Sequence, residues 1–217
     1  MSFDFYNELS RGCQAMGIEL DRPGQERLYT YFVELKKWSQ KVNLIAKGTG
    51  EAEIVENHFL DSLALLPLLP EGAGLLDIGT GAGLPGLICK AARPDLRLFL
   101  VEPRAKRVSF LRHIVRTLQL EGVEIYCSRI EDEPELFASE DISYITSRAV
   151  SDISGFLAMT EGFKSPHIRR LCLKGPRWQE ELAEADEVLA AGNYQREKVV
   201  EYLLPFSGAE RAIVVLR

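Results

Sequence analysis

The sequence lacks the usual features of a secreted, membrane-spanning or metal-binding protein. Its 217 residues contain only four cysteines, and no two of them form a Cys-x-x-Cys pair. This spacing argues against a disulfide framework or a zinc site and favours buried free thiols in a reducing compartment. No apolar run reaches the roughly 18 residues of a membrane span, and the first residues show no basic segment followed by an apolar one. We therefore expect a cytoplasmic protein that uses no metal ion.

Several common catalytic motifs are also missing. The chain contains no Gly-x-Ser-x-Gly, no His-Glu-x-x-His and no P-loop sequence, so nothing indicates a serine hydrolase, a zinc protease or a nucleotide triphosphatase of those types. Acidic residues outnumber basic ones by 32 to 26, for a formal net charge of −6. This balance argues against indiscriminate binding of nucleic acid.

Basic residues are nevertheless concentrated in two segments that contain no acid. The first is Pro103–Leu120 and the second is Phe163–Gln179. Their basic residues are Arg104, Lys106, Arg107, Arg112 and Arg116 in the first, and Lys164, Arg169, Arg170, Lys174 and Arg177 in the second. Such segments are either contact surfaces for a polyanion or ordinary solvated helix faces, and charge alone does not separate the two.

The stretch from Leu75 to Gly86 contains the most informative pattern in the chain. Its sequence, LLDIGTGAGLPG, begins as a buried strand, passes the carboxylate of Asp77 and becomes a glycine-rich turn that leads into an apolar helix. Glycine permits a positive φ and lets a ligand approach the backbone closely. Strand, glycine turn and helix together are the ligand-binding arrangement of a doubly wound α/β sheet.

The acidic residues around this turn indicate which cofactor it binds. Gly81-x-Gly83-x-x-Gly86 matches the nicotinamide fingerprint, whereas Asp77-x-Gly79-x-Gly81-x-Gly83 is the pattern of S-adenosylmethionine (SAM) enzymes. A carboxylate repels a pyrophosphate but attracts the ammonium and sulfonium of SAM. Glu102 ends the next predicted strand, about 20 residues on, where an acid accepts hydrogen bonds from ribose hydroxyls. The combination favours SAM over a dinucleotide.

The hydrophobic pattern predicts an α/β fold in one domain of residues 1–217. Residues 1–70 are mostly helical and form a cap, and residues 71–217 form a Rossmann-like core with a doubly wound, mainly parallel sheet. Expected strands are 75–79, 97–102, 122–127, 141–147 and 168–174; expected helices are 84–92, 104–120, 131–137, 151–164 and 177–190. Residues 198–204 and 212–216 predict a C-terminal antiparallel hairpin, which is typical of class I SAM methyltransferases.

Ligands of doubly wound sheets lie beyond the carboxyl ends of the strands, which adds further candidates. Ile130 and Glu131 can contact an adenine, or they form a plain loop. Arg148 follows the fourth core strand and needs an anionic partner, either a ligand or a structural acid such as Asp77. Lys174 ends the fifth strand, where it can meet a substrate phosphate or simply be solvated.

The sequence names no catalytic base. His58 and Asp61 are spaced i, i+3 on one predicted helix and can act as an acid–base pair, although a core histidine is the alternative. Methyl transfer from a sulfonium relies mainly on positioning, and a ring nitrogen such as guanine N7 needs no deprotonation. Methylation of an exocyclic amine usually requires an Asn/Asp-Pro-Pro-Tyr loop, which the segment Ser147–Ala149 does not provide. An N7 or oxygen acceptor is therefore favoured.

Several separate segments resemble one family, the RsmG (GidB) bacterial 16S rRNA guanine-N7 methyltransferases. The resemblance covers nearly the whole chain. The segments that carry it are Asn43–Ala46, His58–Leu63, Asp77–Gly86, Lys106–Leu111, Ser128–Glu131, Ser147–Ala149 and Leu173–Gly175. Two positions depart from the family pattern. Pro103 follows Glu102 where Asp-Ser is frequent, and Ile45-Ala46 stands where Asn-Leu-Thr is common.

The resemblance implies specific roles for the candidate residues. It implies that Gly79, Leu84, Ile130, Glu131 and Arg148 hold SAM, and that the substrate is a guanine of 16S rRNA in the small ribosomal subunit. Arg104, Arg107 and Lys174 are our candidate RNA contacts, and we expect a cytoplasmic monomer. The alternatives are a small-molecule SAM methyltransferase, a non-catalytic rRNA-binding assembly factor and a nicotinamide dehydrogenase.

Overall fold

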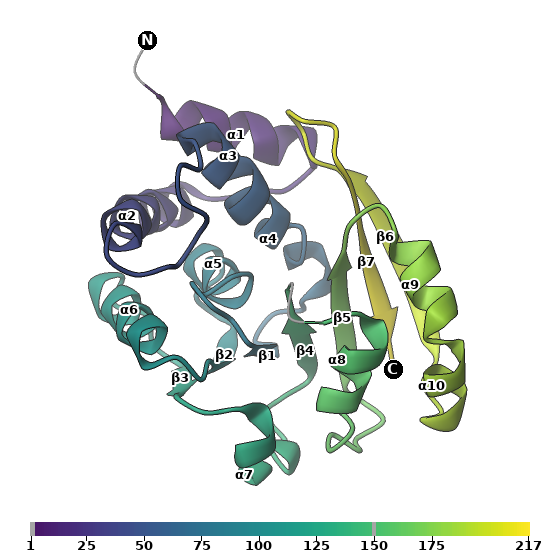
Figure 1. Cartoon of the computed structure of the whole chain (residues 1–217). Coiled ribbons are helices and arrows are strands. Elements are labelled where there is room, and N and C mark those ends of the chain that lie inside the picture. Colours follow the sequence, from purple (N-terminus) through teal and green to yellow (C-terminus); the bar gives the residue numbers. More distant parts are fainter. Residues whose placement is uncertain (1–2, 149–150) are drawn as a thin grey trace.

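The computed structural model describes residues 3–148 and 151–217, and Figure 1 shows its elements. Seven strands form one sheet in the order β3-β2-β1-β4-β5-β7-β6. The strands are β1 (Gly74–Ile78), β2 (Arg97–Val101), β3 (Val123–Tyr126), β4 (Tyr144–Ser147), β5 (Arg169–Lys174), β6 (Arg196–Leu203) and β7 (Glu210–Leu216). The first five pair in parallel, and β7 runs antiparallel to both β5 and β6. The predicted parallel sheet with a C-terminal hairpin is confirmed.

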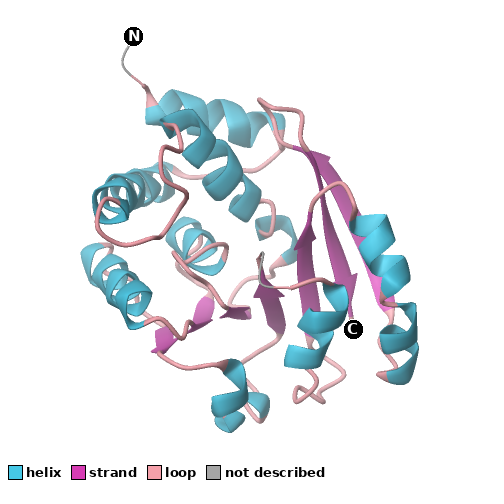
Figure 2. Cartoon of the chain, viewed as in Figure 1, coloured by secondary structure: helices cyan, strands magenta, loops and turns pink. Residues whose placement is uncertain are grey.

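Helices cover both faces of this sheet (Figure 2). The longer ones are α1 (Phe5–Ala15), α2 (Arg22–Ser39), α5 (Gly86–Ala92), α6 (Ala105–Thr117), α8 (Ile153–Met159) and α9 (Trp178–Glu184). Shorter helical segments are α3 (Glu51–Ile54), η1 (Val55–Leu60), α4 (Asp61–Leu63), η2 (Leu66–Leu68), η3 (Ile130–Asp132), α7 (Pro134–Phe137) and α10 (Asp186–Ala191). Aspartates at N-cap positions explain three of the starts. Asp4, Asp21 and Asp152 accept a hydrogen bond from the amide three residues on, at 2.7–3.1 Å.

The central strands bury alternate side chains on the two faces of the sheet. Leu75, Leu98 and Leu100 join one hydrophobic cluster together with α5, α6 and the N-terminal helices. Their neighbours Leu76 and Phe99 join the second cluster, with α7, α8 and α9. This period of two explains why the strands are apolar almost throughout, since a parallel sheet is buried on both faces.

The N-terminal helices lie directly on the first face of the core. Helix α2 donates from Arg27 Nε to the carbonyl oxygen of Ala91 in α5 at 2.6 Å. His113 of α6 contacts the same helix: its Nε2 lies 2.6 Å from a carboxylate oxygen of Glu34 in α2. Because the cap and the sheet share one hydrophobic cluster, burial of the cap depends on the sheet beneath it.

Several local predictions differ from the structure. The helix expected over 151–164 covers only Ile153–Met159, and the helix expected over 131–137 is divided into η3 and α7. Residues 55–60 form a π-helical turn within the predicted third helix; apolar spacing does not distinguish the two helix types over so few residues. Strand β4 begins at Tyr144 rather than near residue 141, and the last predicted core helix is divided at Ala185. Cys127 is exposed, whereas the other three cysteines are buried. Within the described residues, no helix is long and apolar enough to cross a membrane.

The contact between β1 and the loop before β4 leads to a stability prediction. A Cβ on Gly74 would lie 1.7 Å from the backbone carbonyl oxygen of Asp141. Gly74→Ala should therefore lower the free energy of unfolding by about 2–3 kcal/mol, because backbone must move to admit the methyl group. Gly175→Ala is the matched control, since its Cβ meets no atom within 4 Å. Urea unfolding of both variants measures the difference, and equal midpoints would contradict the prediction.

Candidate active site

The glycine turn lies between β1 and α5, at the carboxyl ends of the central strands. Gly79, Gly81 and Gly83 have φ values of 67°, 60° and 85°, a region that disfavours side chains. The amides of Gly79 and Thr80 donate to the carbonyl oxygen of Val101 in β2, at 2.8 and 3.2 Å. The turn is thus fastened to the neighbouring strand, while Gly79 and Gly81 stay partly exposed.

The later glycines of the turn serve internal packing. A Cβ on Gly83 would lie 2.4 Å from the hydroxyl oxygen of Tyr31, and one on Gly86 would lie 2.9 Å from Cβ of Asp77. In contrast, the nearest atom to a Cβ on Gly81 is Nη1 of Arg107, at 3.7 Å. A Cβ on Gly81 would therefore meet only ordinary van der Waals contacts, whereas Gly86 allows α5 to pack closely on β1.

Asp77, near the end of β1, stabilises the turn through two hydrogen bonds. The side chain is fully buried, and its Oδ2 accepts from Thr80 Oγ1 at 2.7 Å and from the Gly86 amide at 2.8 Å. The other oxygen, Oδ1, has no hydrogen-bond partner among the described residues. Burial raises the pKa of Asp77 to about 6, although the two hydrogen bonds and the charge of Arg148 act in the opposite direction.

Glu102 closes the other side of the turn. One carboxylate oxygen accepts from the Gly81 amide at 3.0 Å and the other from the Arg104 amide at 2.9 Å. Arg107 Nη1 lies 3.5 Å from the first of these oxygens. Glu102 is buried, and these three contacts leave about one of the roughly four acceptor positions of a carboxylate. The prediction that Asp77 and Glu102 flank the glycines at adjacent strand ends agrees with this geometry.

The remaining predicted SAM contacts differ in solvent exposure. Ile130 is buried at the start of η3, directly after β3, and Glu131 beside it is exposed. Leu84 is buried and belongs to the first hydrophobic cluster. Tyr31 is a contact that sequence reasoning missed. This fully buried residue of α2 donates its hydroxyl proton to the Ala82 carbonyl oxygen, so the cap supports the turn.

Arg148 directly follows β4 and has protein partners. Its Nη1 donates to the Asn57 carbonyl oxygen at 2.8 Å and lies 3.4 Å from Asp61 Oδ2. Its Nη2 lies 3.3 Å from His58 Nδ1. The structural acid beside Arg148 is therefore Asp61, not Asp77 as the sequence suggested. Ala149, the last residue of the Ser147–Ala149 segment, lies outside the described residues.

His58 is neutral at physiological pH in this environment. Burial, and then the charge of Arg148, lower the pKa of His58 to about 4. A neutral imidazole with a free Nδ1 lone pair suits the role of acceptor for Arg148. The spacing predicted that His58 and Asp61 act as a pair. In the structure both contact Arg148, so the pairing is indirect.

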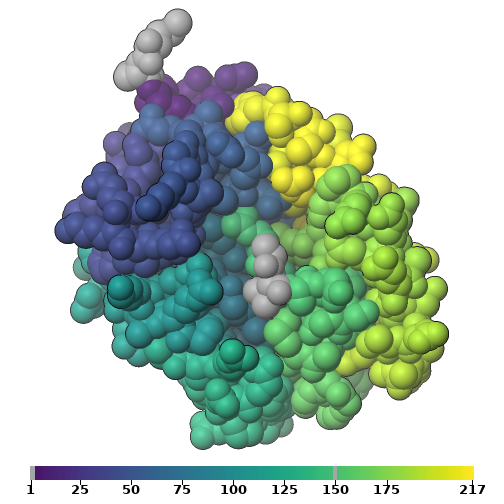
Figure 3. Space-filling view, in the orientation of Figure 1, coloured from purple at the N-terminus to yellow at the C-terminus, as the bar shows by residue number. Residues whose placement is uncertain are grey.

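The cleft beside Arg148 has a volume of about 530 Å³. It lies at the carboxyl ends of β4 and β5, and Figure 3 shows this face of the molecule in space-filling form. Its lining residues are mostly polar or charged: Asn57, His58, Asp61, Arg148, Ser151, Leu173, Lys174, Gly175, Glu181 and Arg211. Lys174 pairs with Glu181 of α9, with Nζ 2.8 Å from the carboxylate, and donates to the Ser151 carbonyl oxygen at 2.9 Å.

The C-terminal hairpin contributes contacts that the sequence did not reveal. Tyr202 donates to Asp61 Oδ1 at 2.8 Å, and Arg211 Nε lies 3.4 Å from the same oxygen. The carboxylate of Glu56 accepts from the amides of Phe206 and Ser207, both at 2.7 Å. These residues are more than 140 positions apart in the chain, so no local sequence signal predicts their contact.

The two basic segments differ in how far their charge is compensated. In the first, Arg104, Lys106, Arg112 and Arg116 are exposed on or beside α6 and form no ion pair with the residues that the structure describes. In the second, Lys164, Arg169 and Lys174 pair with Glu161, Glu197 and Glu181. Arg170 is buried and donates to carbonyl and hydroxyl oxygens of Thr160 and Phe163. The first segment therefore keeps four exposed cations without an ion pair among the described residues, whereas the second keeps one, Arg177.

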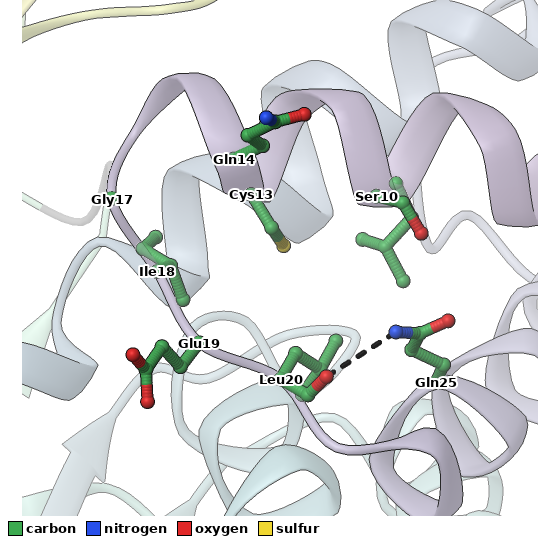
Figure 4. A pocket seen from close by; sticks show the side chains of 9 residues that line it. Ser10, Cys13, Gln14, Gly17, Ile18, Glu19, Leu20 and Gln25 are labelled. Atoms are coloured by element: carbon green, nitrogen blue, oxygen red, sulfur yellow. Dashed lines mark hydrogen bonds between the residues drawn. The ribbon is translucent and has the colours of Figure 1, made fainter.

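A second cavity, between α1 and the loop to α2, has no comparable chemistry (Figure 4). Its volume is about 370 Å³, and Gln25 Nε2 donates there to the Leu20 carbonyl oxygen at 3.2 Å. Burial raises the pKa of the Cys13 thiol to about 11, so this side chain is not a reactive thiolate. Among the described residues, no group of His, Cys, Asp and Glu could hold a metal ion.

The glycine turn fits SAM better than a dinucleotide. Ligand pyrophosphate would face the carboxylates of Asp77 and Glu102, whereas a cation near Asp77 would compensate its buried charge. Comparison with solved structures identifies the fold. M. jannaschii TYW2 in complex with AdoMet aligns with a TM-score of 0.60 at 11% identity, over 82% of this chain and 78% of that one. Aeropyrum pernix fibrillarin with bound S-adenosyl-L-methionine gives 0.52 at 16% identity, over 68% and 67%.

Sequence comparison identifies the family. The chain is 38% identical over 215 residues to the ribosomal RNA small subunit methyltransferase G of Myxococcus xanthus, covering 97% of this chain and 96% of that protein. It is 35% identical over 211 residues to the protein of the same name from Syntrophotalea carbinolica, covering 97% of both. The family model GidB, described as rRNA small subunit methyltransferase G, matches residues 24–213. The chain therefore belongs to the GidB family of SAM-dependent methyltransferases.

Proposed function

We propose that this protein transfers the methyl group of SAM to N7 of a guanine in 16S rRNA of the small ribosomal subunit. The observation that carries the proposal is the family match over nearly the whole chain, together with a glycine turn flanked by Asp77 and Glu102. The target atom rests on the family resemblance and on the chemistry of the site.

The residues of the turn would bind and orient the cofactor. Gly79 and Gly81, which are partly exposed, would contact it through their backbone. Glu102 would accept from its ribose hydroxyls, and Ile130 with Glu131 would contact its adenine. Oδ1 of Asp77 has no hydrogen-bond partner among the described residues, so a cationic group of the cofactor near it would be stabilised. Gly83 and Leu84 are buried, so they would act mainly by shaping the turn. Bound SAM supplies an activated methyl group on a positively charged sulfonium.

The site needs no general base for this reaction. Guanine N7 has a free lone pair, so in-line displacement at the methyl carbon requires alignment rather than proton removal. His58 stays neutral and serves Arg148, and Arg148 would orient the cofactor or the RNA at the edge of the cleft. A small-molecule methyltransferase would share this turn, but it would not need the uncompensated positive charge along α6.

The direct test is SAM binding followed by methyl transfer. Isothermal calorimetry should detect SAM binding by the wild-type protein, and labelled SAM should place one methyl group on guanine N7 of unmodified small-subunit rRNA. Gly81→Val should abolish both, because a β-branched residue is strained at φ 60°. Failure of the wild type to bind SAM would overturn the proposal, and a methyl group on another base would overturn the assignment of the target atom.

Asp77→Asn separates the structural and ligand-binding roles of the carboxylate. The folded pKa of about 6 exceeds the ordinary value of 3.8, so wild-type stability falls as the pH rises through this interval and Asp77 ionises. At 1.36 kcal/mol per pKa unit the change is on the order of 3 kcal/mol. Asp77→Asn should lack this loss between pH 4 and 7, as measured by urea unfolding.

The same variant should bind SAM about tenfold more weakly at pH 7.5, because the compensating charge is gone. Thr80→Val is the control, since it removes one hydrogen bond to Asp77 and keeps the carboxylate. Unchanged SAM affinity in Asp77→Asn would mean that the carboxylate only supports the turn.

The exposed cations of α6 predict how binding of rRNA depends on salt. Arg104→Gln/Arg112→Gln should weaken RNA binding and reduce the slope of log K against log salt by about 1.5 to 2, because two phosphate contacts are lost. Lys164→Gln is the matched control, since Lys164 lies beside Glu161 at 3.7 Å. Filter binding between 50 and 300 mM salt measures the slopes. Equal slopes for all three proteins would argue against contact through α6.

We also infer that residues 1–217 act as one methyltransferase domain. The shared hydrophobic cluster of cap and sheet supports this organisation. A monomer in the cytoplasm is the form that we propose for the enzyme, and sedimentation in solution tests the oligomeric state.

A further inference from the structure

We propose that the cleft at the ends of β4 and β5 holds the target guanine, and that the Lys174–Glu181 pair reads its Watson–Crick edge. This inference rests on the proposed function, which it extends by assigning the base pocket. Strand β4 pairs in parallel with β1, so the cleft after β4 and the cofactor turn after β1 lie at the same edge of the sheet. Its volume of about 530 Å³ is enough for a purine base with part of its ribose.

The pair offers a donor and an acceptor side by side. Lys174 Nζ donates to the Ser151 carbonyl oxygen at 2.9 Å and lies 2.8 Å from Glu181 Oε2. That carboxylate oxygen is buried and has no hydrogen-bond partner among the described residues. At least one of the three Lys174 protons is therefore left for another acceptor. Glu181 has a second carboxylate oxygen and further lone pairs available. Both side chains line the cleft and are only partly exposed, at 10% and 25%. A ligand there would meet both groups in a largely desolvated setting.

This pattern complements guanine and opposes adenine. Guanine presents the O6 acceptor next to the N1–H and N2 amino donors, which match an ammonium next to a carboxylate. Adenine presents an amino donor next to the N1 acceptor, so both contacts would be repulsive. Recognition through this edge leaves N7 free to face the methyl group. Discrimination thus comes from attraction for one base and repulsion of the other.

Gly175 forms the part of the cleft next to this pair. It lines the cleft, and a Cβ on it would meet no atom within 4 Å. A larger side chain therefore projects into empty space rather than into the protein. Gly175→Val gives a way to fill the proposed pocket without disturbing the core, while the Lys174–Glu181 pair stays intact.

Direct binding of guanosine and adenosine 5′-monophosphate tests the pocket separately from catalysis. Calorimetry on the full-length wild type with SAM present should show GMP binding at least tenfold more tightly than AMP. The factor corresponds to one hydrogen bond to a charged group, worth about 1.5–3 kcal/mol. Glu181→Gln should reduce the ratio of GMP affinity to AMP affinity to threefold or less. Gly175→Val should weaken GMP binding at least tenfold. SAM affinity should stay within twofold in both variants.

Equal wild-type affinities for GMP and AMP would overturn the assignment. So would an unchanged ratio in Glu181→Gln, unchanged GMP binding in Gly175→Val, or a loss of SAM affinity in either variant, which would place the pair in the cofactor site. If Glu181→Gln fails to fold, Gly175→Val still tests whether GMP binds in the cleft. If the wild type prefers GMP but does not methylate rRNA, the result would support the pocket and contradict the proposed function.

Discussion

The buried carboxylate of Asp77 is the constraint on which the rest of the site depends. Its Oδ2 binds both Thr80 and the first amide of α5, so one side chain ties the strand, the turn and the helix together. An unpaired anion in this position costs free energy, and the raised pKa of Asp77 records that cost. A ligand cation near Oδ1 would recover part of it. The burial that ties strand, turn and helix together through Asp77 thus disfavours its charged form.

The N-terminal cap and the C-terminal hairpin meet at the cleft beside Arg148. Asp61 is their common point, since it lies near Arg148 of the core and accepts from Tyr202 of the hairpin. Asn57, in the π-helical turn before it, accepts from Arg148 through its carbonyl oxygen. Both ends of the chain therefore help to position the arginine that follows β4. A change in the hairpin can act on the site through Asp61 without touching any ligand.

Much of the fold was predictable because it depends on short-range pattern. Alternating strands and helices followed from runs such as Leu98–Val101, and the hairpin followed from its turn residues. Asp77 and Glu102 were placed near each other because parallel strands end at the same edge. The partners of Arg148 and Lys174 were not predictable in this way. They come from the N-terminal helices and from α9, and their approach depends on how these elements pack.

The sequence by itself determined the cofactor turn, the family and the presence of two basic segments. Glycine positions and a preceding carboxylate restrict the backbone and the local charge directly, so they act wherever the chain folds. Only the tertiary structure decided which basic segment keeps its charge and which acid faces each cation. Ion pairing depends on distance through space, and Glu161, Glu181 and Glu197 reach the second segment, whereas α6 keeps four exposed cations without an ion pair among the described residues.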